Sequence, residues 1–128
     1  MRIGLSHFEL KVRDMARMED FYTRVLDFVV TDRNPPNAHP MVFLSADPGE
    51  HHQIVLTGAG DGEFRAGSLD HLAFRVDGLG ALRQKHALLG NDLDRSVETV
   101  SHGTTWSIYF RDPEGNRLEL FADTPWYV

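Results

Sequence analysis

The sequence predicts an α+β protein built from two tandem βαβββ units, and three observations lead to this prediction. The octet "LSHFELKV" at residues 5–12 is matched by "LDHLAFRV" at residues 69–76, an offset of 64 (69 − 5 = 64) in a chain of 128 residues. The turn sequences "DPGE" and "DPEGN" hold matching places in the two halves. Strand-like and helix-like segments also follow the same order in both halves, which indicates that one supersecondary unit occurs twice.

The first unit is predicted to cover about residues 1–60. Residues 3–12 alternate apolar and polar side chains, as a strand does. Asp14 is a suitable N-cap for a helix over residues 13–28, which carries an apolar stripe at three- and four-residue steps: Met15, Met18, Phe21, Tyr22, Val25 and Leu26. Three strands follow, "FVVTDR", "MVFLSA" and "HHQIVLTG", with the proline-rich loop "NPPNAHP" after the first. The glycine-rich stretch "AGDGEFRAG" then serves as a connector.

The second unit is predicted over about residues 67–123. "SLDHLAFRV" forms its first strand and "DGLGALRQKHALLG" its helix. The strands "LDRSVET", "TTWSIYFR" and "RLELFA" complete it. The remaining tail, residues 124–128, is expected to dock its Trp126 and Tyr127 on a surface or on a second subunit.

Composition excludes several classes of function. The net charge is −6 and no basic run occurs, which argues against a nucleic-acid partner. No apolar stretch reaches membrane-spanning length, and the N-terminus has no signal-peptide pattern. Cysteine is absent, so disulfides, thiolate catalysis and zinc–cysteine sites are excluded. These features predict a cytoplasmic protein without a membrane partner. The chain has seven histidines, and because histidine binds metals and carries protons near neutral pH, each of them needs an explanation.

The repeat predicts a metal site. Two such units usually pack about a pseudo-twofold axis, so equivalent positions face each other across it. His7 and His71 are equivalent (71 − 7 = 64), and so are Val55 and Glu119 (119 − 55 = 64). Two imidazoles and one carboxylate form the facial triad that suits Fe(II) and leaves open positions for substrate and oxygen. Mn(II) would also fit, and ligand type alone does not exclude Ni, Co or Zn.

Some of these side chains also have structural interpretations. Glu119 stands in the apolar run "LELF" and needs a partner there, for which Arg117 and Arg75 are candidates. His52 has the wrong parity to share a strand face with Val55 unless a bulge or a strand end turns it. His51 has the right parity but stands further from the predicted metal. Both histidines are otherwise solvated turn residues.

Three aromatic residues and one histidine extend the predicted site. Tyr109 lies on the strand next to that of Glu119 and can reach its partner's site. His102 precedes the strand of Tyr109. Phe43 and Trp106 hold roughly equivalent places (106 − 43 = 63) and are expected either to wall an aromatic-friendly pocket or to pack in the core.

The stretches "LSHFELKVRDMARMEDFYTRVLDF", "LDHLAFRV" and "YFRDPEGNRLELF" resemble the vicinal oxygen chelate superfamily of glyoxalase I, bleomycin-resistance proteins and extradiol dioxygenases. The resemblance covers essentially the whole chain and implies a half-barrel of βαβββ units around a metal site. Extradiol dioxygenases use two His and one Glu as ligands, which match His7, His71 and Glu119. Glyoxalase I typically places a fourth ligand, Glu, where this chain has Val55.

The resemblance further implies an Fe(II)-dependent ring cleavage of a catechol-type aromatic diol with O₂. His52 matches the acid–base histidine of that branch, and Tyr109 and His102 match residues that hydrogen-bond the reacting groups. The well-studied enzymes have twice as many βαβββ units, so one pocket wall is expected either to come from the partner in a homodimer or to be absent. The sequence leaves open whether the two units pack within one chain or swap between two chains. Two alternatives are an oxygen-independent metalloenzyme, such as a lyase or epimerase, and a protein that binds an aromatic antibiotic.

Overall fold

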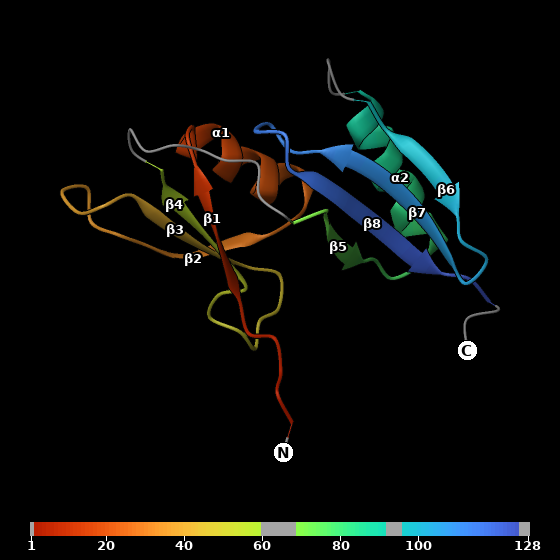
Figure 1. The fold of residues 1–128 in the computed structure, drawn as a ribbon, viewed down its shortest axis with the longest axis horizontal. Helices are drawn as coiled ribbons and strands as arrows, with labels where there is room; N and C mark the ends of the chain where they lie inside the picture. Colours follow the sequence, from red (N-terminus) through yellow and green to blue (C-terminus); the bar gives the residue numbers. More distant parts are fainter. Residues whose placement is uncertain (1, 60–68, 92–95, 126–128) are drawn as a thin grey trace. The chain divides into compact units, whose positions relative to one another are not determined.

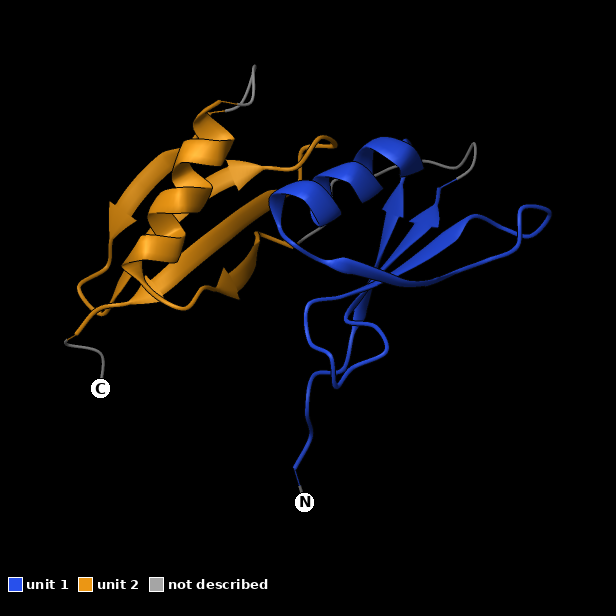
Figure 2. Ribbon diagram, turned by 180° about the vertical axis from the view of Figure 1, so that it is seen from behind, with its two compact units in different colours: residues 1–65 blue, residues 66–128 orange. Residues whose placement is uncertain are grey.

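The computed structural model describes residues 2–59, 69–91 and 96–125. The chain divides into two compact units, Met1–Arg65 and Ala66–Val128, which Figure 2 shows in two colours. Nearly all of the predicted connector and the last three residues of the predicted tail, with Trp126 and Tyr127, lie outside the described ranges. Within these ranges, no helix is long and apolar enough to cross a membrane.

The first unit has the predicted βαβββ order. Its elements are β1 (Phe8–Val12), α1 (Met15–Asp20), the π-helical turn η1 (Phe21–Val25), β2 (Val29–Arg33), β3 (Met41–Ser45) and β4 (Ile54–Gly58). The sheet has the order β1-β4-β3-β2, with β1 parallel to β4 and the other neighbours antiparallel (Figure 1).

The predicted helix over residues 13–28 is shorter and changes type along its length. Asp14 is its N-cap, as predicted, because its Oδ1 accepts a hydrogen bond from the Arg17 N–H at 3.1 Å. The α-helix passes into a wider π turn at Phe21, and Asp27 adopts a φ of 62°, which a helix cannot continue. The apolar stripe is nevertheless kept, since its central members are buried: Met18, Phe21, Tyr22 and Val25.

Strand β1 is also shorter than predicted. Residues 3–7 alternate like a strand, but Ile3 and Leu5 are 97% and 90% exposed. The neighbouring strand explains the difference, because β4 begins at Ile54, whose register partner is Phe8. The N-terminal segment therefore has no β4 residues beside it, and a strand without a partner is not stabilised.

The second unit repeats the order of the first. Its elements are β5 (Leu72–Arg75), α2 (Leu79–Gly90), β6 (Glu98–Ser101), β7 (Thr105–Arg111) and β8 (Arg117–Asp123). The sheet order is β5-β8-β7-β6, with β5 parallel to β8, and α2 packs against β7 and β8 (Figure 2). The predicted α+β fold with two tandem βαβββ units is thus confirmed, with each sheet open at its edges.

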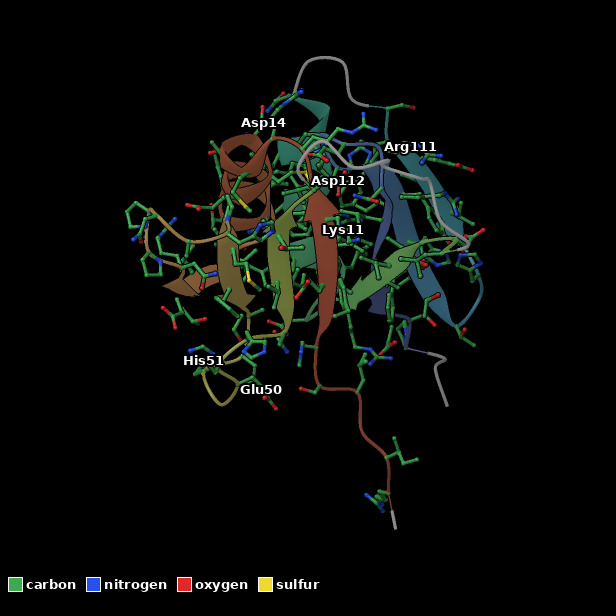
Figure 3. All side chains as sticks on the ribbon, turned by 60° about the vertical axis from the view of Figure 1, so that its left-hand side comes forward. Lys11, Asp14, Glu50, His51, Arg111 and Asp112 are labelled. Carbon is green, nitrogen blue, oxygen red and sulfur yellow. The ribbon has the colours of Figure 1, made fainter. Side chains whose placement is uncertain are left out.

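The turn between β7 and β8 is held by one buried carboxylate. Asp112, labelled in Figure 3, accepts hydrogen bonds at Oδ1 from the backbone N–H groups of Glu114 and Asn116, at 2.9 and 3.0 Å. Gly115 supplies the positive φ of 89° that this turn requires. The "DPEGN" turn therefore fixes the register of the hairpin.

The two faces of the second sheet differ in chemistry. Side chains alternate along a strand, and one face of β7 and β8 packs with Leu82 and Leu89 of α2 to form the apolar core: Ile108, Phe110, Leu118, Leu120 and Ala122. Each buried aliphatic or aromatic side chain contributes roughly 1.5–3 kcal/mol. The opposite face carries Ser107, Tyr109 and Glu119, so polar groups gather on the side away from the helix.

Candidate active site

The strand registers show that the two units place equivalent residues at equivalent positions. Phe8 pairs with Ile54 in the first sheet, and Leu72 pairs with Leu118 in the second, each displaced by 64 (72 − 8 = 64, 118 − 54 = 64). His7 and His71 each stand one residue before the first strand of their unit, rather than inside it. The sequence offset therefore describes a true structural repeat in these strands.

Glu119 pairs with His71 and Ser107. Glu119 stands in the middle of β8 and is 8% exposed. Its Oε1 lies 3.0 Å from His71 Nε2, and its Oε2 accepts a hydrogen bond from the Ser107 hydroxyl at 2.6 Å. Both oxygens of the buried carboxylate thus have partners, as burial of a charge demands.

The two arginines considered as structural partners of Glu119 have other contacts. Arg75 forms an ion pair with Asp123 at 3.2 Å. Arg117 lies 3.4 Å from Asp70, and its guanidinium stacks 4.2 Å from the centre of the Tyr109 ring. The simpler interpretation, in which an arginine neutralises Glu119, is therefore not what the structure shows.

His71 lies between two carboxylates, and this arrangement suits a cation. Its Nδ1 is 2.7 Å from Asp70 Oδ1. The hydrogen bond to His71 is the main reason that the pKa of Asp70 lies below its usual value, so Asp70 is ionised. A carboxylate can only accept a hydrogen bond, so the Nδ1–H of His71 is the donor. His71 Nε2 then faces Glu119 Oε1 favourably only when a proton or a metal ion lies between them. A carboxylate on the second nitrogen is also the usual support for a metal-binding histidine.

Tyr109 stands directly opposite Glu119 in the β7–β8 register. Its hydroxyl lies 3.0 Å from Nε2 of His102, and its ring centre lies 5.9 Å from that of His71. Burial, and then the negative charge of Glu119, raise the pKa of Tyr109. The phenol therefore stays neutral near pH 7. Four residues predicted from the sequence come together in this unit: His71, His102, Tyr109 and Glu119.

The first unit gathers histidines in the loop before β4. The His7 and His52 rings meet edge to face, with centres 4.4 Å apart, and the Phe43 ring centre lies 5.4 Å from that of His52. Because β4 begins only at Ile54, the alternation of that strand does not govern residue 52. The strand end thus turns His52 toward His7, one of the two possibilities that the sequence left.

His51 has a different position. Its ring is exposed, and its Nε2 lies 3.8 Å from Asp32. Figure 3 shows His51 on the loop before β4. Its Nδ1 lies 2.9 Å from Nδ1 of His52. His52, rather than His51, is therefore the histidine whose ring packs against His7.

The expected equivalence of Phe43 and Trp106 is wrong. Phe43 faces Val55 across the first hairpin and Tyr109 faces Glu119 across the second, so Phe43 corresponds to Tyr109, an offset of 66 (109 − 43 = 66). The connection between β3 and β4 is two residues longer, which shifts the repeat in these strands. Trp106 consequently lies on the helix-covered face of its sheet.

The sequence did not identify two residues that contribute to the candidate site. Ser107 was not singled out, although it lies two residues before Tyr109 and so on the same strand face. Asp70 was also overlooked, and its only signal is that it precedes His71. Short polar residues of this kind are common, and only their contacts distinguish them.

Among the described residues, no three His, Asp or Glu side chains gather closely enough to hold a metal ion. His71 and Glu119 belong to the second unit, and His7 belongs to the first with His52. The three-ligand site therefore stays a prediction. His39 bonds Thr57 at 3.2 Å and His86 lies on α2, so neither joins these clusters.

Comparison with known families agrees with this fold. The sequence-family model of the Glyoxalase/Bleomycin resistance protein/Dioxygenase superfamily matches residues 4–120 of this chain. The chain therefore belongs to this superfamily, whose resemblance was already visible in the sequence.

Individual relatives fall into more than one branch. The chain is 36% identical over 127 residues to biphenyl-2,3-diol 1,2-dioxygenase 3 of Rhodococcus globerulus, covering 93% of this chain and 63% of that protein's length. It is 30% identical over 124 residues to lactoylglutathione lyase of Escherichia coli O157:H7, covering 93% of this chain and 92% of that protein. The crystal structure of a glyoxylase/bleomycin resistance protein/dioxygenase domain from Frankia sp. EAN1pec superimposes with a TM-score of 0.73 at 28% identity, covering 99% and 96% of the two chains.

Proposed function

We propose that the protein is an Fe(II)-dependent extradiol dioxygenase that cleaves a catechol-type aromatic diol with O₂. The observation that carries this proposal is the cluster of His71 and Glu119 beside the hydrogen-bonded pair of Tyr109 and His102. The similarity to a biphenyl-2,3-diol dioxygenase supports it. Val55 supports it as well, because an apolar residue stands where the lyase branch typically carries a ligand.

The residues present fit a divalent metal. His71 and Glu119 would hold it from the second unit, and His7 would be the third ligand. Two neutral imidazoles and one carboxylate are the ligand set of non-haem Fe(II); Mn(II) fits too, and Ni, Co and Zn are alternatives by ligand type. When bound, Fe(II) would acidify a coordinated diol and supply the redox chemistry for O₂.

The surrounding side chains would handle protons and orientation. His52 packs on His7 and would take a proton from the diol and return it later, a role suited to imidazole near neutral pH. Tyr109 is a neutral phenol and would donate a hydrogen bond to an oxygen of the substrate. His102 contacts the Tyr109 hydroxyl at 3.0 Å and would orient it. Phe43, beside His52, offers an aromatic edge to a substrate ring.

The test is anaerobic reconstitution with Fe(II), followed by catechol or 2,3-dihydroxybiphenyl in an oxygen electrode. We expect stoichiometric oxygen uptake and a yellow ring-opened product. His7→Ala, His71→Ala and Glu119→Ala should each lose metal and activity, whereas His39→Ala is a control that should change neither. Tight metal binding in one of the first three variants would contradict that ligand assignment.

The acid–base role of His52 has its own test. His52→Ala should retain one metal per chain and lose turnover, because the ring touches His7 without being a ligand. His51→Ala removes the neighbouring imidazole from the same loop and is the matched variant. Full activity of His52→Ala would refute the assigned role.

A second candidate is an oxygen-independent metalloenzyme of the lyase type. It is favoured by the similarity to lactoylglutathione lyase, because the match covers 92% of that protein's length. Turnover of a hemithioacetal with Ni(II) or Co(II) under anaerobic conditions would support it. Oxygen uptake with a diol would instead support the dioxygenase.

The proposal includes a homodimer in the cytoplasm. The chain spans 63% of the length of the dioxygenase relative. In this proposal, a second copy of the chain supplies further pocket wall. Sedimentation equilibrium of the reconstituted protein tests this, with twice the 14.5 kDa chain mass expected. A monomer with full activity would contradict it.

A further inference from the structure

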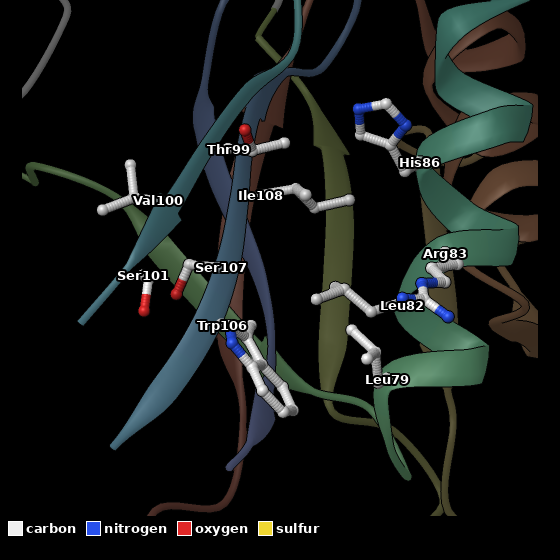
Figure 4. Close-up of a pocket in the computed structure, with 10 residues that line it drawn as sticks. All are labelled: Leu79, Leu82, Arg83, His86, Thr99, Val100, Ser101, Trp106, Ser107 and Ile108. Atoms are coloured by element: carbon white, nitrogen blue, oxygen red, sulfur yellow. The ribbon is translucent and has the colours of Figure 1, made fainter. Parts of the chain in front are cut away.

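The second unit contains a cavity on the side of its sheet opposite to Glu119. The cavity measures about 400 Å³ and lies between α2 and the strands β6 and β7 (Figure 4). Its apolar walls are Leu79 and Leu82 from the helix and Trp106 and Ile108 from β7. This volume is within the range of pockets that hold small organic ligands, roughly 300–1,000 Å³.

The ionisable side chains that line this cavity are basic. Arg83 and His86 line it from α2 (Figure 4). Arg83 stands about one helical turn after Leu79, and His86 stands about two turns after it. No Asp or Glu is among the described residues that line it, although the chain has 19 acidic residues and a net charge of −6. Arg83 has no ion-pair partner among the described side chains. The cavity is therefore a cationic place on an acidic protein.

The start of α2 adds to this polarity. Gly78 is its N-cap and provides no side-chain hydrogen bond, and the first turn carries no acidic residue. The first turn of the helix thus has no carboxylate to offset the positive end of the helix dipole, although Asp77 precedes the cap. Leu79, in that first turn, lines the cavity.

We propose that this cavity binds a small aromatic acid, with the ring among Trp106, Leu79, Leu82 and Ile108 and the anionic group at Arg83. The flat indole of Trp106 favours an aromatic ring, and burial of the ring in the apolar walls supplies the affinity. The guanidinium of Arg83 suits a carboxylate or sulfonate, with which it forms paired hydrogen bonds. Thr99 closes the side of the cavity on the edge strand β6.

This site is distinct from the candidate active site. Trp106 and Ile108 alternate along β7 with Ser107 and Tyr109. Ser107 also borders the cavity, but its hydroxyl donates a hydrogen bond to Glu119 on the far face. A ligand in the cavity therefore contacts neither Glu119 nor the phenol of Tyr109. The inference consequently does not depend on the proposed function.

The experiment titrates the full chain with 8-anilinonaphthalene-1-sulfonate, an aromatic sulfonate that becomes fluorescent in apolar sites. We expect saturable binding of one molecule per chain. Arg83→Gln should weaken it about fivefold, the effect of losing about 1 kcal/mol from a partly exposed charged contact. Lys85→Gln removes the same charge from the same helix outside the cavity and should leave binding unchanged.

Two further measurements locate the site. Thr99→Phe places a ring in the cavity from an exposed strand position and should abolish binding while the far-UV circular dichroism stays native. In the unmodified protein, the dye should shift the indole N–H resonance of Trp106, assigned through Trp106→Phe. Equal binding by Arg83→Gln and Lys85→Gln, no dye fluorescence, or an unshifted Trp106 resonance would each overturn the proposal.

Discussion

The hydrogen bond from Ser107 to Glu119 should make a large contribution to stability. The two side chains lie on adjacent strands, 2% and 8% exposed, with the hydroxyl 2.6 Å from Glu119 Oε2. Ser107→Ala removes the donor, so Oε2 of the buried Glu119 carboxylate loses this hydrogen bond. The volume lost is a single oxygen atom, so the loss of packing is small.

The size of the effect follows from the charge. A hydrogen bond to an ionised group contributes about 1.5–3 kcal/mol, against about 0.5–1.5 kcal/mol for a neutral pair. Ser45 provides the neutral comparison, because it is 4% exposed and its hydroxyl donates to the Asp47 carbonyl at 2.9 Å and accepts from the Asp47 N–H at 3.2 Å. We expect Ser107→Ala to lower the free energy of unfolding by about 2 kcal/mol and Ser45→Ala by about 1 kcal/mol.

Urea unfolding of the metal-free protein, followed by circular dichroism, measures both values. The dependence of the free energy of unfolding on urea should be the same in the unmodified protein and in the two variants, so that their midpoints can be compared directly. If Ser107→Ala costs no more than Ser45→Ala, the Glu119 oxygen is satisfied in another way and the reasoning is wrong.

Three further predictions concern the second unit. Leu118→Ala should lower the free energy of unfolding by about 2–5 kcal/mol in urea titrations, because Leu118 is fully buried; a loss below about 1 kcal/mol would show that this core is loosely packed. Gly115→Ala should cost about 1–2 kcal/mol by the same assay through its φ of 89°, since nothing lies within 4 Å of the added Cβ; an unchanged midpoint would contradict the strain. In metal-free protein, the phenolate absorbance of Tyr109, obtained as the difference from Tyr109→Phe, should appear above the usual pKa of 10.0. A raised pKa in the folded state also means that stability falls as pH rises from about 10 through that pKa; a phenolate that forms below pH 10 would contradict both statements.

Much of the fold could be predicted because its pattern is local. The apolar stripe through Met18 and Val25 predicted a buried helix, and both residues are buried. The change to a π turn at Phe21 could not be predicted, since a stripe at three- and four-residue steps fits both helix types. The end of β1 also depends on where another strand begins: Leu5 alternates correctly but has no partner beside it.

The candidate site was predicted where the repeat holds. The offset of 64 correctly related the His71 and His7 positions, because β1 and β5 pair in the same register with β4 and β8. The rough equivalence of Phe43 and Trp106, at an offset of 63, was wrong, because the longer connection between β3 and β4 shifts the repeat in β3. The face that His52 meets could not be predicted either, since strand alternation does not apply to a loop residue.

That difference in loop length has a consequence for how such a molecule diversifies. Phe43 and Val55 are separated by 12 positions (55 − 43 = 12), and Tyr109 and Glu119 by 10 (119 − 109 = 10). The sheets keep the same strand order despite these two additional residues. A duplicated half can therefore gain imidazoles in a lengthened hairpin while its framework stays unchanged, and the two copies are free to specialise separately.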